Sequence, residues 1–335
     1  MRLIAMCLGL TAFGWGASRQ LEVYFVDVEG GQATLMVAPS GESLLIDTGW
    51  PGFESRDAHR IAKAAERAGV HQIDYLLVTH FHVDHAGGVP QLAALLPIKN
   101  FVDHGESIER DADGAKLYQS YTAVRAKGRH IEVKPGSVLP IRGMRAEIVT
   151  AAGQRIEKPL PGAGAANPFC GETKLRDTDP SENAQSVGTV VTLGRFRLVD
   201  LGDLTWNKEF ELMCPTNRLG RADVYVVTHH GMNMSGTPAM VKGLQARAAI
   251  MDNGAVKGGT AEAWDTMHGT PGLQDIWQVH FADAGGPQHN SPEDYIANLH
   301  QNPDAGDWIH LTARQDGSFT IENGRNGFKK DYPAR

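Results

Sequence analysis

Cysteine is scarce in this chain, and there is no excess of positive charge. Three cysteines occur among 335 residues, and the formal net charge is −7. This charge provides no overall basic surface for nonspecific nucleic-acid binding, although it does not exclude a local basic groove. Internal repeats and low-complexity tracts are also absent. Hydrophobic residues make up 41% and charged residues 21% of the chain, which is typical of a soluble protein with one large core or two small ones.

Long apolar runs are missing everywhere except at the N-terminus. Met1-Arg2 precedes an apolar stretch over 3–15 and small residues at 16–18. This pattern predicts a bacterial-type secretory signal peptide over 1–18, with a buried N-terminal segment of a cytoplasmic protein as the alternative. We therefore expect an exported, periplasmic or secreted protein with no membrane span in the mature chain. Removal of the peptide leaves Cys170 and Cys214, whose pairing the sequence leaves open.

The densest group of candidate metal-ligating residues lies in one short segment. His80, His82, Asp84 and His85 fall within six consecutive residues, directly after an apolar segment over 73–78 that predicts a buried strand. Open α/β sheets place their sites on such strand-to-helix loops. Zinc and similar ions bind imidazole nitrogen and carboxylate oxygen. His80 and His82 can share one ion, and Asp84 and His85 can serve a second.

Other polar residues also follow predicted strands. Asp47 ends a strand over 43–47, where it can support the loop of metal ligands or serve as an ordinary turn residue. Asp203 follows a strand over 196–201 and can bridge two ions or cap the next helix. His229 repeats the Val-Thr-His pattern of His80, so we expect it to be a ligand. The next residue, His230, would face the substrate or donate a proton.

The remaining histidines carry weaker signals. His104 follows a strand and is a possible extra ligand or substrate contact, but structural roles are expected for His268, His280 and His289. The rest of the chain predicts strands over 21–28 and 33–38, helices over 57–68, 204–213 and 292–299, a long loop near the site over 154–180, a closing hairpin over 308–321 and a solvated tail.

The His-x-His-x-Asp-His pattern of 80–85 resembles the signature of the metallo-β-lactamase superfamily, and 45–49 resembles its first motif. Within it, the segments 26–33, 183–187 and 229–231 look like those of the hydrolase domain of bacterial competence DNA-uptake proteins. The resemblance covers about residues 21 to 255. It implies an α/β fold, a four-layer αβ/βα sandwich, forming a single domain over 19–325 with a loop-rich insertion around 104–182.

The resemblance also implies two divalent ions, most simply zinc, with manganese or iron as alternatives. The expected ligands are His80, His82 and Asp203, with Asn183 or water, for the first ion, and Asp84, His85, Asp203 and His229 for the second. Many members place another histidine shortly before the bridging Asp, but here that region holds Asn183 and no histidine. We therefore expect the second site to bind its ion more tightly, with Asp47 and Asn183 supporting the ligands.

The chemistry implied is hydrolysis by metal-activated water, with Asp84 as an acceptor of its proton. Three functions stay open. The first is cleavage of a phosphodiester or other polar ester-like bond. The second is hydrolysis of a lactone, thioester or β-lactam, and the third is a non-catalytic metal-binding scaffold. A small-molecule or phosphodiester substrate is expected, without a stable nucleic-acid complex. The oligomeric state stays open.

Overall fold

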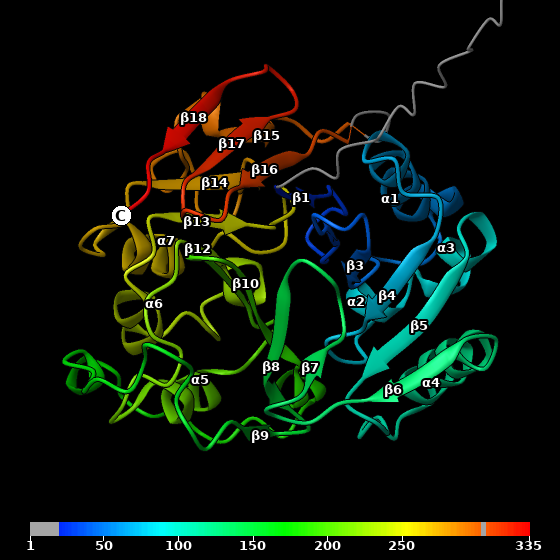
Figure 1. Ribbon diagram of the computed structural model, residues 1–335, viewed down its shortest axis with the longest axis horizontal. Coiled ribbons are helices and arrows are strands. Elements are labelled where there is room, and N and C mark those ends of the chain that lie inside the picture. Colours follow the sequence, from blue (N-terminus) through cyan, green and yellow to red (C-terminus); the bar gives the residue numbers. More distant parts are fainter. Residues whose placement is uncertain (1–19, 303–305) are drawn as a thin grey trace, which may run out of the picture.

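A computed structural model describes residues 20–302 and 306–335 (Figure 1). The expected signal peptide lies outside the described residues. Two large sheets, here called sheet A and sheet B, dominate the fold. Within the described part of the chain, no helix is long and apolar enough to cross a membrane.

Sheet A is built mainly from the N-terminal half of the chain and is completed by the last three strands. Its strand order is β18 (Lys329–Tyr332), β17 (Phe319–Asn323), β16 (Ile309–Ala313), β1 (Leu21–Phe25), β2 (Thr34–Val37), β3 (Ser43–Ile46), β4 (Ile73–Leu77), β5 (Ile98–Asp103) and β6 (Arg129–Glu132). The run from β3 to β6 is parallel. The carboxyl ends of these strands therefore lie along one edge.

Sheet B contains the strands from the middle of the chain. Its order is β15 (Ile296–Asn298), β14 (Asp275–His280), β13 (Ala248–Met251), β12 (Val224–Val226), β11 (Phe196–Asp200), β10 (Gly188–Leu193), β8 (Arg145–Ala151) and β7 (Val138–Leu139), and β9 (Gln154–Arg155) pairs with β8. The strands from β11 to β15 are parallel. Their carboxyl ends likewise share one edge.

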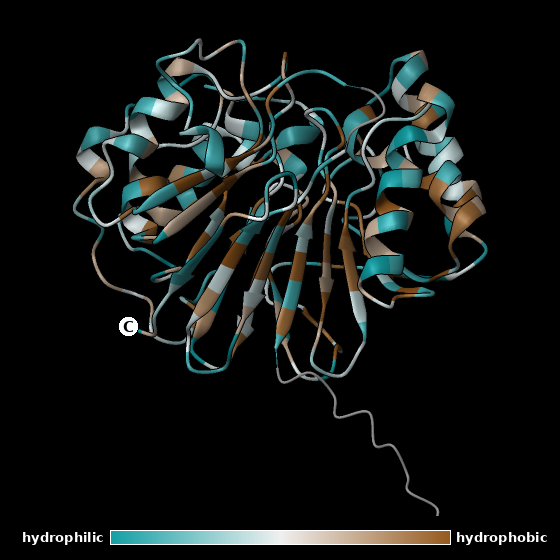
Figure 2. Ribbon diagram, turned by 90° about the horizontal axis from the view of Figure 1, so that it is seen from above, coloured by the Kyte–Doolittle hydropathy of each residue, from teal (hydrophilic) through white to brown (hydrophobic). Residues whose placement is uncertain are grey.

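Helices cover the outer face of each sheet. Sheet A carries α1 (Arg56–Arg67), α3 (Val89–Leu95) and α4 (Ala112–Arg125), and sheet B carries α5 (Trp206–Met213), α6 (Pro238–Leu244) and α7 (Ala261–His268). Figure 2 shows the helices on the two outer sides, with the strands between them. One core cluster joins side chains of both sheets, and two more join each sheet to its helices. The four-layer αβ/βα sandwich is confirmed.

Periodicity explains why these segments take their places. In α1, Ile61, Ala64 and Ala65 are buried on one side, while Lys63 and Glu66 are exposed. That spacing is the apolar stripe of a helix packed on a sheet. The parallel strands β4 and β12 are apolar along nearly their whole length, because both of their faces are covered.

Three expectations about the boundaries were wrong. The tail continues as β18, where Tyr332 is buried, accepts a hydrogen bond from Trp277 Nε1 (2.9 Å) and donates one to Asp275 (2.6 Å), so the domain does not end at 325. The segment 104–151 is no insertion, since α4, β6, β7 and β8 belong to the two sheets and their helical cover. The helix expected over 292–299 is one 3-10 turn, Glu293–Tyr295, followed by β15.

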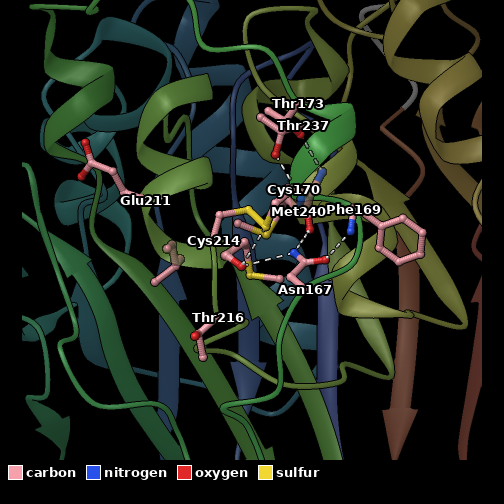
Figure 3. Close-up of a disulfide and its surroundings, with 12 residues drawn as sticks. Asn167, Phe169, Cys170, Thr173, Glu211, Cys214, Thr216, Thr237 and Met240 are labelled. Atoms are coloured by element: carbon pink, nitrogen blue, oxygen red, sulfur yellow. Dashed lines mark hydrogen bonds between the residues drawn. A yellow bond between two sulfur atoms is a disulfide. The ribbon is translucent and has the colours of Figure 1, made fainter.

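The long loop over 154–180 packs mainly against the helices of sheet B. Cys170 and Cys214 form a disulfide that ties the loop to the end of α5 (Figure 3). Beside it, the amide of Asn167 donates hydrogen bonds to Met213 O (3.2 Å) and Ala239 O (2.9 Å). The loop is therefore fastened to the outer face of the sandwich.

The disulfide closes a loop with a sequence separation of 44 residues. Crosslinking a loop of this length restricts the unfolded chain, so Cys170→Ala with Cys214→Ala should lower the free energy of unfolding by about 2–4 kcal/mol. Urea unfolding of the double variant and of the wild type measures the difference. Under a reducing agent the wild type should lose a similar amount. Identical urea midpoints for the two proteins would contradict this account.

Candidate metal centre

The candidate residues gather where the carboxyl ends of the parallel strands of both sheets meet. Asp47 follows β3, and the segment 79–85 follows β4. From sheet B, Asp203 follows β11 and the pair His229-His230 follows β12. The two sheets thus supply opposite halves of one cluster, and all of these residues except His82 and Val83 are buried.

Asp47 organises the half that comes from sheet A. Its carboxylate accepts hydrogen bonds from Thr79 N (2.8 Å) and Thr79 Oγ1 (2.6 Å), and its Oδ2 lies 2.7 Å from His85 Nδ1. One proton of His85 is therefore on Nδ1, and Nε2 is directed into the cluster, where a cation can replace a second proton. A carboxylate behind a histidine in this way is the usual support of a metal ligand.

Hydrogen bonds at Nδ1 also orient the imidazoles of His80 and His229. His80 Nδ1 lies 3.0 Å from Thr79 Oγ1, which is already the donor to Asp47, so the imidazole donates from Nδ1, and its Nε2 lies 3.0 Å from His82 Nδ1. His229 Nδ1 lies 3.3 Å from Ser235 Oγ, whose own proton goes to Leu204 O (2.7 Å). Hydrogen bonding at Nδ1 thus directs the Nε2 of each ring toward the cluster.

Asp203 is the residue around which the imidazoles gather. Its Oδ2 lies 3.3 Å from both His85 Nε2 and His229 Nε2, and 3.9 Å from His80 Nε2. Its Oδ1 lies 3.3 Å from His230 Nε2. Both oxygens of one carboxylate therefore face ring nitrogens from both sheets.

Gly202 allows this approach. Its φ of +56° suits glycine, and a Cβ there would stand 2.8 Å from Thr79 Cβ. A larger residue would therefore push Asp203 away from the segment that carries His80.

The positions of the two adjacent histidines differ from the expectation, in which His229 was a ligand and His230 faced the substrate. His230, not His229, joins Asp84, His85 and Asp203 in a group whose ligand atoms all lie within 4.8 Å of one another. His229 and His230 have φ values of 57° and 55°, so both are left-handed and the chain turns sharply. The repeat of the Val-Thr-His pattern did not reveal this turn, because the pattern carries no backbone geometry.

His82 lies at the open side of the cluster. Its Nδ1 is 3.0 Å from His80 Nε2, and its Nε2 is 3.5 Å from Glu109 Oε1. About 31% of its side chain is exposed, so this is where the centre is accessible to solvent.

Asn183 and His104, two further candidates, have different surroundings. Asn183 is buried in a 3-10 turn before β10, and its Oδ1 has no hydrogen-bond partner among the described residues. Its neighbour Glu182, which the sequence did not single out, accepts a hydrogen bond from Phe81 N (3.0 Å) and lies 3.0 Å from His104 Nε2. His104 is therefore paired with a carboxylate behind the ligand loop.

Sequence reasoning also missed Lys257. Its ammonium contacts the carboxylate of Asp84 and lies 5.4 Å from the centre of the Trp50 ring. It belongs to a glycine-rich loop after β13, where no periodicity marks a single lysine as functional. Its position gives the cluster a positive charge on the side of Asp84.

The glycine-rich turn near the N-terminus supports Asp84 from behind. Gln32 N donates to Asp84 O (3.2 Å), and a Cβ on Gly31 would stand 2.3 Å from that same oxygen. Gln32 Nε2 also donates to Asp200 Oδ2 (2.7 Å) at the end of β11. This turn therefore connects the ligand loop of sheet A to sheet B.

Burial and neighbouring charges act in opposite directions on the pKa values of Asp84 and Asp203. Burial alone would raise the pKa of Asp84 and of Asp203. The histidines around both groups, together with Lys257 beside Asp84, hold each pKa well below its usual range. Both carboxylates are therefore ionised across neutral pH and available as ligands.

The histidines divide into two kinds. Burial lowers the pKa of His80 and of His229, so both are neutral near pH 7. Burial also acts against a charge on His85 and His230, but the facing carboxylates outweigh it and raise the pKa of His230 to about 10. Binding a cation at these two must displace protons, so affinity should fall as the pH falls.

The donor set fits metal ions. His85 Nε2 and His230 Nε2 face each other at 3.2 Å, and two lone pairs at that distance need a proton or a cation between them. Asp203 Oδ1 and Asp252 Oδ1 are buried without a hydrogen-bond partner among the described residues. Buried groups of this kind require compensation, and imidazole with carboxylate suits zinc, iron or manganese.

A second group of possible ligands lies nearby and has a different character. Asp27, Glu29 and His280 come together, but Arg60 NH1 lies 2.8 Å from Asp27 Oδ2 and 3.5 Å from Glu29 Oε1. The guanidinium of Arg60 therefore already compensates the negative charge of these carboxylates. His280 thus takes the structural role that was expected for it.

Comparison with known proteins shows what the chain is similar to. Residues 26–175 match the family model described as the Metallo-beta-lactamase superfamily. Members of this superfamily are generally hydrolases, and the His/Asp cluster is able to hold metal. The resemblance stated from the sequence is confirmed.

Two curated proteins are similar to the chain. ComE operon protein 3 of Bacillus subtilis (strain 168) is 26% identical over 251 residues, covering 71% of this chain and 29% of that protein. Lactamase-like protein aptB of Emericella nidulans is 44% identical over 69 residues, covering 20% of this chain and 21% of that protein. The chain thus spans less than a third of the length of either relative.

Solved structures with similar folds include the metallo-beta-lactamase fold protein YhfI from Bacillus subtilis. It is 13% identical, with a TM-score of 0.44, over 76% of this chain and 96% of that one. A metallo-beta-lactamase mutant from Cronobacter sakazakii is 17% identical, with a TM-score of 0.39, over 61% of this chain and 75% of that one.

Asp47→Asn should weaken metal binding while leaving the fold in place. The amide can no longer accept from Thr79 and His85 together without placing a donor against one of them, so His85 loses its fixed tautomer. We expect metal affinity to fall about 10- to 100-fold. Titration against a competing chelator measures it. Asp74→Asn, which removes a carboxylate from the same sheet away from the cluster, should bind metal like the wild type.

Asp200 should make stability depend on pH. Burial raises its pKa to about 7, against the hydrogen bonds from Gln32 and Gly202 that lower it. Between about pH 4 and pH 7 the folded chain keeps this proton while the unfolded chain has lost it, so stability falls by up to ~1.4 kcal/mol per pH unit. Above pH 7 the contribution is constant.

Asp200→Asn removes this dependence. The urea midpoint of the variant, measured against that of the wild type, should rise steadily from pH 4 to pH 7 and then level off. The exposed Asp177→Asn serves as control and should show no such trend. A constant difference between wild type and Asp200→Asn at all pH values would refute the assignment.

Proposed function

We propose that this protein is a dinuclear metal-dependent hydrolase acting on a phosphodiester or a similar polar ester bond. The observation that carries the proposal is the placement of Asp203 between imidazoles from both sheets: its Oδ2 lies 3.3 Å from the Nε2 atoms of His85 and His229, and its Oδ1 lies 3.3 Å from His230 Nε2. Two divalent ions, when bound, supply a hydroxide from water near neutral pH and polarise the bond attacked. In the proposed reaction the oxygen of water would bond to phosphorus, one ester P–O bond would break, and the leaving alcohol would take up a proton.

The ligands divide between two sides of Asp203. His230 Nε2 faces Oδ1 and groups with Asp84, while His85 Nε2 lies 3.2 Å from His230 Nε2 and 3.3 Å from Oδ2. On the other side, His80 and His82 lie in contact, and His229 reaches the same carboxylate oxygen as His80. His229 thus takes the place of the third histidine that the sequence lacks before Asp203.

The chain's own residues prepare the remaining chemistry. Asp84 is ionised at neutral pH and can accept the proton that water releases. Lys257 holds a positive charge beside it, where it can bind a non-bridging oxygen of an anionic substrate. This ammonium favours a phosphodiester over a neutral lactone or β-lactam.

The disulfide supports the proposal that the protein is exported. Cys170 and Cys214 are bonded, and such bonds persist in oxidising compartments. Location in the periplasm or outside the cell, with the N-terminal segment acting as the signal, is therefore part of the proposal.

A substrate panel tests the reaction class. Purified protein loaded with zinc or manganese should hydrolyse bis(4-nitrophenyl) phosphate faster than a lactone or a cephalosporin. Hydrolysis of none of the three with metal bound would favour a metal-binding scaffold. Absence of transition metal from the purified protein, or full metal occupancy in Asp203→Ala, would overturn the proposal.

Single histidine variants test how the ligands are shared. His229→Ala and His230→Ala should each reduce bound metal from about two ions to about one per chain, because each ring faces a different side of Asp203. Each should lower the rate about 100-fold or more, since both ions are needed. Elemental analysis and the aryl phosphate assay measure these effects. The exposed His268→Ala should match the wild type, and loss of both ions in His229→Ala would refute the division.

A further inference from the structure

A groove of about 740 Å³ begins at His82, on the open side of the metal centre. It runs between the start of α2 (Val83–Ala86) and α3 on one side and the N-terminal part of α4 on the other. Because His82 lines the groove and also touches His80, a ligand reacting at the centre can extend directly into it. The groove is therefore placed to hold one arm of the substrate.

Part of the lining of the groove is apolar. Phe81, Val83 and Leu117 line it, together with Pro51 and Pro90. Val83 is 41% exposed although it lies directly beside His82. Apolar surface next to a reactive centre favours a ligand with an apolar body, which would remove that surface from water.

Another part of the lining is acidic. Glu109, Asp111 and Asp113 line it, against a single ammonium, that of Lys116. Asp111 accepts hydrogen bonds from the backbone N–H groups of Asp113 and Gly114 at the start of α4, so its charge is partly taken up by the helix. Glu109 and Asp113 remain to set the field along the groove.

Charge is thus arranged differently on the two sides of the centre. Lys257 offers a cation beside Asp84, where the reacting phosphate would lie. The groove beyond His82 offers carboxylates. In a polynucleotide the neighbouring phosphate would meet these carboxylates, and like charges at close range repel.

We propose that the substrate is a small phosphodiester, one of whose ester arms has an apolar body and a cationic end and lies in this groove. The arm's body packs on Val83 and Leu117, and its cation faces Glu109 and Asp113. This inference rests on the proposed function, because it assigns the substrate class of the same centre. It adds no chemical step, since water still replaces one ester oxygen on phosphorus.

Binding without turnover gives the first test. Benzyltrimethylammonium carries an apolar ring and a fixed cation, and benzyl alcohol carries the ring alone. Calorimetry with the metal-loaded protein should show the cation binding about 5-fold more tightly than the alcohol, as expected for a partly exposed charge pair. Glu109→Gln with Asp113→Asn should abolish that preference. Glu157→Gln with Asp177→Asn, outside the groove, should retain it. Equal binding of the two probes to the wild type would overturn the proposal.

Turnover gives the second test. The 4-nitrophenyl phosphodiester of a quaternary-ammonium alkyl alcohol should have a higher kcat/KM than 4-nitrophenyl ethyl phosphate, by about 5-fold from the same charge pair. A thymidine octanucleotide should be cleaved at least ~10-fold less efficiently than either, because its flanking phosphates meet the carboxylates that line the groove. Glu109→Lys with Asp113→Lys should reverse the order of the charged substrates.

Different results would contradict the proposed function and the assignment of the groove. If no phosphodiester is hydrolysed by the metal-loaded protein, the proposed function is wrong. If aryl phosphodiesters are hydrolysed but the octanucleotide is cleaved equally well and charge reversal changes nothing, only the assignment of the groove is wrong.

Discussion

The buried carboxylate of Asp203 is the constraint on which the rest of this structure depends. An ionised group without water requires compensating charge at close range. Here the compensation comes from imidazoles on both sheets, with His85 from one and His229 and His230 from the other. The site therefore depends on how the two sheets pack, because the cluster exists only where the two sheets bring their strand ends together.

Several further contacts hold those strand ends in register. Asp47 ties β3 to the segment after β4, and Gln32 joins the glycine-rich turn to Asp200 at the end of β11. A buried pair, His280 with Asp27 (2.7 Å), connects the end of β14 to the segment after β1. Each is a polar link between parts distant in sequence, in a region where apolar packing alone would leave the ligands poorly oriented.

Much of the fold and of the centre could be read from the chain. Strands β1 to β4, α1 and α5 were predicted close to their observed bounds, because their apolar patterns reflect one covered face or two. The closely spaced ligand segment 79–85 was recognised because its residue types and spacing suit few other purposes. The predictions were wrong where the hydrophobic pattern carries no information. Strand β18 is short and charged, and the turn at His229-His230 depends on two residues with left-handed backbone conformation.

The sequence by itself determined the layered α/β architecture and which side chains could bind metal, since periodicity and residue chemistry are local properties. Only the tertiary structure decided which of His229 and His230 joins Asp84, that Lys257 stands beside it, that Cys170 pairs with Cys214, and that an acidic groove begins at His82. These depend on contacts between segments far apart in the chain, and their distances follow from packing, which no local pattern contains.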